Sequence, residues 1–170
     1  MTPEQTTQWR LPENYEPAKS TGGSYTKLQD WDTKIRILTS PIIWYVYFTV
    51  DNKPKRSKTM FKSTNDIKQD WKVKEFRAFV VWNYDEEKVQ IMEVTQNTIK
   101  DQIYALAKDE DFGDPKNYDL KINRSWKDLE TRYQVKALAQ KPFTNEEAIK
   151  ESRSVNLEAL YEWEDPFKPF

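Results

Sequence analysis

Apolar and polar residues alternate along residues 33–39, and this alternation leaves Lys34 and Arg36 on the side opposite two isoleucines. A period of two predicts a strand with one face buried and the other in solvent. After a proline, residues 42–50 are β-branched or aromatic at nearly every position, which predicts a strand that is apolar on both faces. A loop or hairpin tip is expected at residues 51–59, which carry four basic side chains.

Two further pairs of strands are predicted downstream. Residues 76–83 and 88–94 are separated by four residues, three of them acidic, which indicates a short hairpin. Alternation around Lys121 and around Arg132 indicates a second hairpin that turns at residues 125–129. Between the two pairs, apolar residues recur at helical spacing, and this predicts a helix.

The predicted order of elements favours one fold class. Strands, then one helix, then a last strand pair suit a mainly β, α+β fold. The leading candidate is an OB-fold-like closed barrel of five or six strands, whose faces and loops commonly bind oligonucleotides. We expect a flexible N-terminal arm at residues 1–24, an OB-fold-like domain at residues 25–143, and a short helix with an acidic, aromatic tail at residues 144–170.

The residue types that are missing exclude many functions. The chain has no cysteine and no histidine, so disulfides, Cys/His zinc sites, cysteine nucleophiles and histidine-based acid–base catalysis are impossible. With only three glycines, it holds no Walker loop or dinucleotide fingerprint. The acidic residues 109–114 fail the calcium-loop template, because position 120 is a leucine rather than the closing glutamate. We expect no catalytic residues, no metal and no cofactor, although magnesium-dependent carboxylate chemistry stays open.

Hydropathy bears on location. No run of about 18 apolar residues is present, so we expect no membrane span. The first residues lack the charged-then-apolar pattern of a secretion signal. The expected location is therefore the cytoplasm.

Charge is segregated along the chain, although the formal net charge is only −1. Residues 33–83 hold eleven Lys or Arg against four Asp or Glu, a balance of +7. The same comparison gives four against nine (−5) for residues 84–118, six against three (+3) for 119–143, and three against seven (−4) for 144–170. Such segregation indicates an anionic partner, although the same charges can simply solvate the surface.

Aromatic residues are interleaved with the basic ones. Tyr45 and Tyr47 share one face of their strand, and a small barrel cannot enclose all the rings. Bases of a single strand stack on such rings at about 1–3 kcal/mol each, while Lys and Arg track the phosphates. Core packing is the competing interpretation for any one ring, and a solvated tip is the competing interpretation for the basic loop. The expected stacking residues are Tyr45, Tyr47, Phe79 and Trp82. The full set of candidate nucleic-acid-binding residues is Lys34, Arg36, Tyr45, Tyr47, Lys53, Lys55, Arg56, Lys58, Arg77, Phe79, Trp82, Lys121 and Arg132.

Residues 162–170 are acidic and aromatic and carry a second hypothesis. A detached tail could fold back on the basic groove as a mimic of DNA, or present a ring to a partner protein. The alternative is that this segment packs on the domain. The candidate partner-binding residues are Trp163, Glu164, Asp165, Phe167 and Phe170.

Eight segments carry a family resemblance through their order and spacing. They are KIRILTSPI (34–42), FVVWNY (79–84), IMEVTQNTI (91–99), DEDFGDP (109–115), YDLKINR (118–124), LETRYQV (129–135), NLEAL (156–160) and DPF (165–167). From about Tyr25 to the end, the chain resembles a family of phage-encoded single-stranded DNA-binding proteins with an OB-type core, similar to the helix-destabilising proteins of T-even phages. This resemblance implies sequence-independent binding during phage DNA replication or recombination.

The chain departs from that family in two ways. The T-even relatives use a zinc module in the core, which a chain without Cys or His must lack or replace. The family's hairpin turn usually carries a glycine, where this chain has Ser125, Trp126, Lys127 and Asp128. That turn is expected to be longer or differently shaped.

The expected function is to coat and protect exposed single-stranded DNA without catalysis. Further expected partners are phage replication or recombination proteins, through the tail, and other copies of the chain along the DNA. One rival function is a protein-interaction module that regulates a replication or recombination enzyme through the acidic tail. Another is a metal-dependent nuclease that acts through carboxylates.

Overall fold

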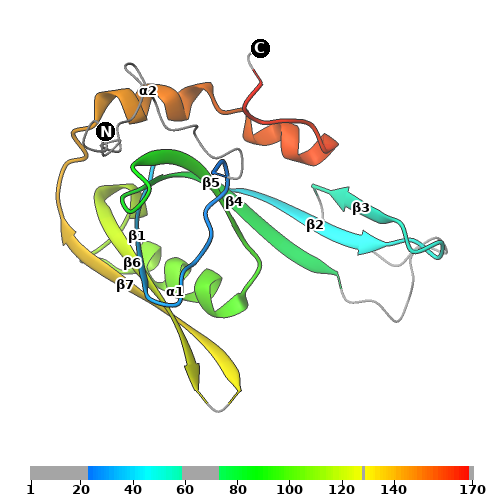
Figure 1. Ribbon diagram of the computed structural model, residues 1–170, viewed down its shortest axis with the longest axis horizontal. Coiled ribbons are helices and arrows are strands. Elements are labelled where there is room, and N and C mark those ends of the chain that lie inside the picture. Colours follow the sequence, from blue (N-terminus) through cyan, green and yellow to red (C-terminus); the bar gives the residue numbers. More distant parts are fainter. Residues whose placement is uncertain (1–22, 59–72, 128, 169–170) are drawn as a thin grey trace, which may run out of the picture.

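The computed structural model describes residues 23–58, 73–127 and 129–168, and it contains one sheet of seven antiparallel strands with two α-helices (Figure 1). The strands are β1 (Asp32–Ile37), β2 (Ile42–Phe48), β3 (Pro54–Ser57), β4 (Lys74–Asn83), β5 (Lys88–Val94), β6 (Tyr118–Lys127) and β7 (Glu130–Gln140). The α-helices are α1 (Asn97–Lys108) and α2 (Glu146–Ser154), and the short 3-10 helices are η1 (Pro115–Asn117) and η2 (Leu157–Glu162). The α+β, OB-like fold is as predicted, but the sheet is open and has one or two strands more than expected.

β4 organises the sheet. One edge of β4 pairs with β5, and the other edge pairs first with β2, at residues 74–78, and then with β1, at residues 81–83. β1 and β2 therefore act like one long strand that is interrupted at residues 38–41, where Pro41 has no backbone N–H to donate. β6 and β7 continue the curved sheet beyond β1, whereas β2, β3 and the start of β4 project to one side (Figure 1). We call this projecting part the arm.

The helix α1 packs beside β7 and closes part of the open side of the sheet. Its Ile99 is fully buried in the interior. The side-chain Nε2 of Gln102 donates to the carbonyl of Tyr133 at 3.1 Å, and its Oε1 accepts the N–H of Val135 at 2.8 Å. A neighbouring strand would bond to β7 in the same way, so one side-chain amide replaces a strand at this position.

Apolar layers lie on both faces of the sheet. The interior is filled from β1, β4, β5, β6 and α1, and Ile35, Val81 and Leu120 are fully buried there. The outer face of β2, β4 and β5 is covered by α2 and η2, which contribute Ala148 and Leu160. Figure 1 shows α2 and η2 lying along this outer face.

Several predicted elements are confirmed. The strand that begins at residue 42, the hairpin that turns at residues 84–87 and the helix after β5 are all present. The short final helix begins where expected, because the side chain of Asn145 accepts the N–H of Ala148. The turn between β6 and β7 is tighter than predicted, since the two strands extend to residues 127 and 130.

β3 corrects one prediction. A loop or hairpin tip was predicted at residues 51–59, and a turn does join β2 to β3 there, but residues 54–57 pair with β2 as a strand. The flexible N-terminal arm predicted at residues 1–24, which is distinct from the arm formed by β2, β3 and β4, falls almost wholly outside the described residues. Within the described part of the chain, no helix has the length and apolar character needed to cross a bilayer.

Candidate nucleic-acid interface

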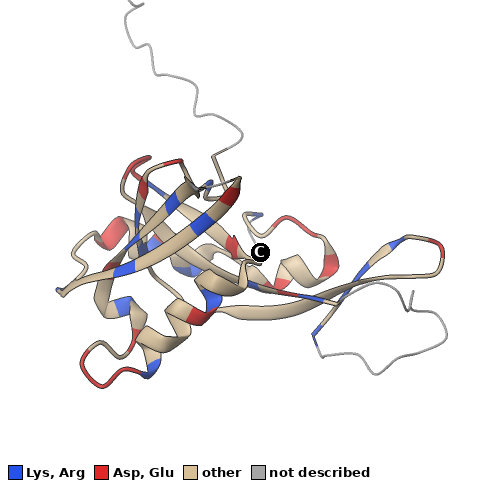
Figure 2. Ribbon diagram, turned by 90° about the horizontal axis from the view of Figure 1, so that it is seen from below, with Lys and Arg blue, Asp and Glu red and all other residues tan. Residues whose placement is uncertain are grey.

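Three lysines form a row across the outer face of the open, barrel-like sheet. Lys34 in β1 is paired with Lys121 in β6, which is paired in turn with Lys136 in β7. Like charges directly opposite each other destabilise a sheet, and neither Lys121 nor Lys136 forms an ion pair with any described residue. This row therefore offers closely spaced positive charge to an anion. Figure 2 shows Lys and Arg as bands along the strands, whereas much of the acidic charge lies in loops.

A buried carboxylate lies beside this row. Asp119 is fully buried, and its Oδ1 accepts hydrogen bonds from the Nε of Arg36 and the hydroxyl of Tyr84, both at 2.7 Å. The Nζ atoms of Lys141 and Lys34 lie 3.2 Å and 3.8 Å from its Oδ2. Burial alone would raise the pKa of the Asp119 carboxyl, but the hydrogen bonds from Arg36 and Tyr84 and the adjacent ammonium of Lys141 outweigh it and hold the pKa below the ordinary 3.8. One negative charge thus faces three cations.

Arg36 corrects a sequence-based prediction. It was expected on the polar face of β1, free to bind phosphate, but it is only 1% exposed. Besides Asp119, its guanidinium donates to the carbonyls of Lys116 at 3.0 Å and Lys141 at 2.9 Å. Because these contacts join the start of β6 to the end of β7, the role of Arg36 is structural.

Tyr84 presents a neutral ring to this surface. Burial and the hydrogen bond to Asp119 raise the pKa of its phenol to about 12. The Nζ of Lys34 lies 4.4 Å from the ring centroid, within the range of a cation–π contact. Tyr84 therefore stays protonated at neutral pH and holds Lys34 in place.

An aromatic pocket adjoins the lysine row. It has a volume of about 320 Å³ and is lined by Trp82, Tyr84, Phe143 and the exposed Lys141. The ring centroids of Trp82 and Phe143 are 6.5 Å apart, and both rings are half-buried. We call the lysine row and this pocket together the barrel face, made of Lys34, Lys121, Lys136, Lys141, Trp82, Tyr84 and Phe143.

The sequence identified part of the barrel face. Lys34, Trp82 and Lys121 were among the candidates, whereas Lys136 and Lys141 were not. Lys136 has the same alternation as Arg132, so the pattern contained its signal, but the pairing with Lys121 depends on register. Arg132 itself lies toward the turn of the β6–β7 hairpin, where its Nη2 is 4.0 Å from Oε2 of Glu130.

A second set of candidates lies on one face of the arm. Tyr45 and Tyr47 share this face with Lys55 and with Arg77, as the strand pairing requires. Both tyrosines are half-buried, and Trp44 on the opposite face is fully buried. The predicted division of β2 into two faces is therefore confirmed.

Phe79 corrects a second prediction. It was expected to stack on bases at the surface, but it is 4% exposed and belongs to the interior cluster. Phe79 also lines a pocket beside α1. The pattern placed Phe79 on the correct side of β4, since it shares a face with Val81, but that side faces the apolar interior.

The remaining basic candidates divide between the turn of the arm and its other face. Lys53 is exposed at the turn before β3. The guanidinium carbon of Arg56 lies 3.5 Å from the ring centroid of Trp163 and 5.3 Å from that of Trp44, and Arg56 donates to the carbonyl of Leu160. The Nζ of Lys58 is 4.7 Å from the centroid of Tyr161. The C-terminal segment therefore contacts Arg56 and Lys58, two of the four basic residues at positions 51–59 that were candidates for binding nucleic acid.

The acidic tail is docked rather than detached. The hydroxyl of Tyr161 donates to the carbonyl of Ile43 at 3.1 Å, and the ring of Phe167 lies 6.3 Å from that of Tyr25. Glu164 and Asp165 are exposed, as is most of Trp163. Phe170 lies outside the described residues.

No protein-family model, curated protein sequence or solved structure matches this chain.

Proposed function

We propose that this chain is a phage single-stranded DNA-binding protein that acts in the host cytoplasm during DNA replication or recombination. It coats and protects exposed strands without regard to sequence and catalyses no reaction on them. The observation that carries this proposal is the row of Lys34, Lys121 and Lys136 beside a pocket of aromatic rings. Phosphates follow the lysines, and bases enter the pocket.

The chemistry of the barrel face favours single strands. Trp82, Tyr84 and Phe143 offer ring surface, and every base has a face that can stack on a ring, so such contacts tolerate any sequence. In a duplex the base faces are stacked on each other and cannot reach a ring pocket. The sequence resemblance to phage single-stranded DNA-binding proteins supports the same function.

The test is fluorescence polarisation of labelled oligo-dT across a salt series. The wild-type chain is expected to bind with micromolar or tighter affinity that weakens steeply with salt, because each lysine that neutralises a phosphate releases a counterion. The double variant Lys121→Glu/Lys136→Glu is expected to bind more weakly, and its salt slope should be shallower by about 0.7 for each phosphate that a lysine no longer neutralises. Lys150→Glu, which reverses a charge on α2, is the matched control and should bind like the wild type.

Two results would remove the proposal. One is wild-type binding that is absent or insensitive to salt, and the other is an equal loss in the control variant. The nuclease alternative is tested in parallel by incubating labelled single strands with magnesium or manganese, where intact strands are expected.

A further inference from the structure

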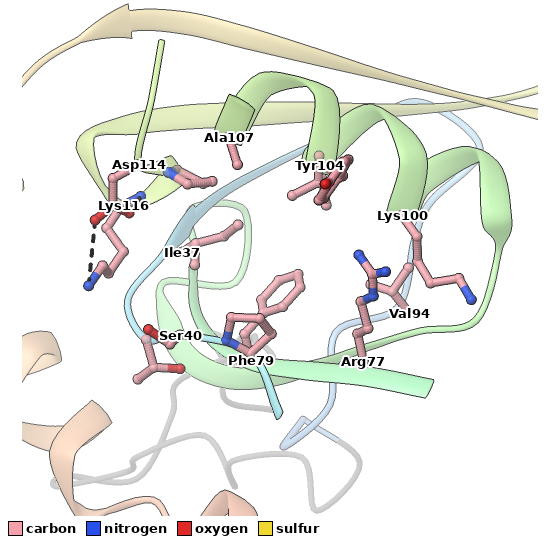
Figure 3. A pocket seen from close by; sticks show the side chains of 14 residues that line it. Ile37, Ser40, Arg77, Phe79, Val94, Lys100, Tyr104, Ala107, Asp114 and Lys116 are labelled. Carbon is pink, nitrogen blue, oxygen red and sulfur yellow. Dashed lines mark hydrogen bonds and ion pairs between the residues drawn. The ribbon is translucent and has the colours of Figure 1, made fainter. Parts of the chain in front are cut away.

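A separate pocket of about 320 Å³ lies between α1, the connection from β1 to β2, and η1 (Figure 3). Its floor is apolar and includes Ile37, Phe79 and Val94. Tyr104, on α1, is 56% exposed and lies at the rim. Figure 3 shows the rings of Phe79 and Tyr104 on opposite sides of the cavity. We call this cavity the helix pocket.

Three cations surround the helix pocket. The Nζ of Lys100 is 3.1 Å from the carbonyl oxygen of Glu75, and the Nε of Arg77 is 3.0 Å from the carboxylate of the same residue. No hydrogen bond joins the terminal nitrogens of Arg77 to any residue in the described part of the chain. The third cation is Lys116, whose Nζ lies 3.7 Å from Oδ2 of Asp114. The rim therefore carries three cations against the carboxylates of Glu75 and Asp114, an excess of one positive charge among the described residues.

The helix pocket continues onto the arm. Ile43 in β2 is paired with Arg77, and Tyr45 is paired with Glu75, which holds Arg77 and Lys100. The face of the arm that carries Tyr45 and Tyr47 thus leads to Arg77 at the edge of the helix pocket. A DNA strand that follows this face of the arm would therefore reach the apolar helix pocket, with Arg77 at its edge.

We propose that the helix pocket receives one unpaired nucleobase, with the phosphate of the same nucleotide bound by Arg77. The inference rests on the proposed function and adds to it a base-insertion site distinct from the barrel face. The volume lies at the lower end of ligand pockets, which suits a single planar ring rather than a larger molecule. An inserted base lies between two rings and excludes water from the apolar floor, as in proteins that hold an extruded base. The positive rim complements the phosphate.

The test uses two alanines on the last turns of α1. Ala107 lines the helix pocket, whereas Ala105 does not, and both are exposed. Ala107→Trp is expected to fill the cavity, and Ala105→Trp is the matched control. The probe is dTMP, titrated into the labelled full-length chain and followed by two-dimensional NMR of the backbone amides.

In the wild type and in Ala105→Trp, dTMP is expected to shift the amide signals of Phe79, Lys100 and Tyr104. These shifts should vanish in Ala107→Trp. The affinity of Ala107→Trp for oligo-dT should fall by about 5-fold to 150-fold, the range expected for one stacked base. If Ala107→Trp fails to fold, Tyr104→Ala removes one ring without adding bulk and should weaken dTMP binding.

Each other outcome is decisive. Shifts that persist in Ala107→Trp, shifts confined to Trp82 and Tyr84, or no shifts at all would overturn the helix pocket as a base site. Shifts at the pocket that depend on protein concentration without dTMP would show that a second copy fills it, which also overturns the inference. If the chain binds oligo-dT but dTMP shifts no amide signal, the base site is overturned and the proposed function stands. If dTMP shifts the signals but oligo-dT does not bind, the proposed function is overturned and the pocket remains a nucleotide site.

Discussion

The Nε of Arg36 lies 2.7 Å from Oδ1 of Asp119, and both side chains are buried beneath the surface that we propose for DNA. A buried charge that loses its partner is costly, because no water replaces the missing contact. This pair therefore holds the cations of the barrel face in position without itself touching a ligand.

The substitution Asp119→Asn tests this role. It leaves the guanidinium of Arg36 buried without an opposite charge, and the free energy of unfolding should fall by about 3–5 kcal/mol. Urea denaturation measures the loss. Glu130→Gln is the control, because Glu130 pairs with Arg132 at an exposed site, where such pairs contribute less than about 1 kcal/mol. Equal effects of the two substitutions would contradict a structural role for Asp119.

The free energy of unfolding at acidic pH should depend on the carboxylate of Asp119. The pKa of Asp119 is lower in the folded state than the ordinary 3.8, so its charged form stabilises the fold above that value. This contribution is lost as pH falls through the folded-state pKa. The difference in unfolding free energy between wild type and Asp119→Asn should be constant near neutral pH and shrink below about pH 4. A difference that grows on acidification would contradict the prediction.

The phenol of Tyr84 should ionise at a higher pH than a free phenol. Its folded-state pKa is about 12, against 10.0 for a free phenol. The neutral phenol therefore stabilises the fold fully below pH 10, and the stabilisation is lost as pH rises toward 12. The ultraviolet absorbance of ionised phenol, taken as the difference between wild type and Tyr84→Phe, should follow this pKa. Asp119→Asn should shift the Tyr84 transition toward lower pH, and no shift would disprove the coupling.

The C-terminal segment should loosen when Arg56 is replaced. Arg56→Met removes both the contact with the Trp163 ring and the hydrogen bond to the carbonyl of Leu160. We expect a local loss of about 1–3 kcal/mol, measured as faster amide hydrogen exchange in η2. Lys55→Met is the matched control, because the adjacent Lys55 lies on the opposite face of β3. Unchanged exchange in Arg56→Met would show that other contacts hold the segment.

Removal of residues 162–170 separates the proposed function from its rival. The residues of the barrel face lie outside the removed segment, so affinity for oligo-dT should be retained or increase as acidic charge is lost. Fluorescence polarisation measures this affinity. If a replication or recombination protein binds through the tail, that interaction should vanish in the truncated chain. A large loss of DNA affinity would instead place the tail within the DNA-binding site.

The sequence predicted which face of a strand a side chain occupies better than it predicted which distant residues are in contact. Alternation in β2 separated Tyr45 from the buried Trp44 correctly, because side-chain direction depends only on local geometry. It could not show that Arg36 would meet Asp119, which is 83 positions away. That contact depends on the register of β1 against β6, which local patterns do not specify.

The charge pattern had a similar limit. The excess of cations in residues 33–83 was visible, but those that the structure describes divide among the barrel face, the turn and two faces of the arm, and the interior. Lys136 joined the row from a different charge block, because β7 pairs with β6. The sequence showed where cations are in excess, and the pairing of strands in the sheet determined which of them lie together.

The Gln102 amide has a consequence beyond closing the sheet. The outer edge of β7 would otherwise present bare backbone groups, on which another chain could add a strand. By pairing with residues 133 and 135, Gln102 occupies the middle of that edge. Gln102 thereby limits the addition of another chain's strand at this edge, which a protein of the proposed function would need when many copies lie side by side on DNA.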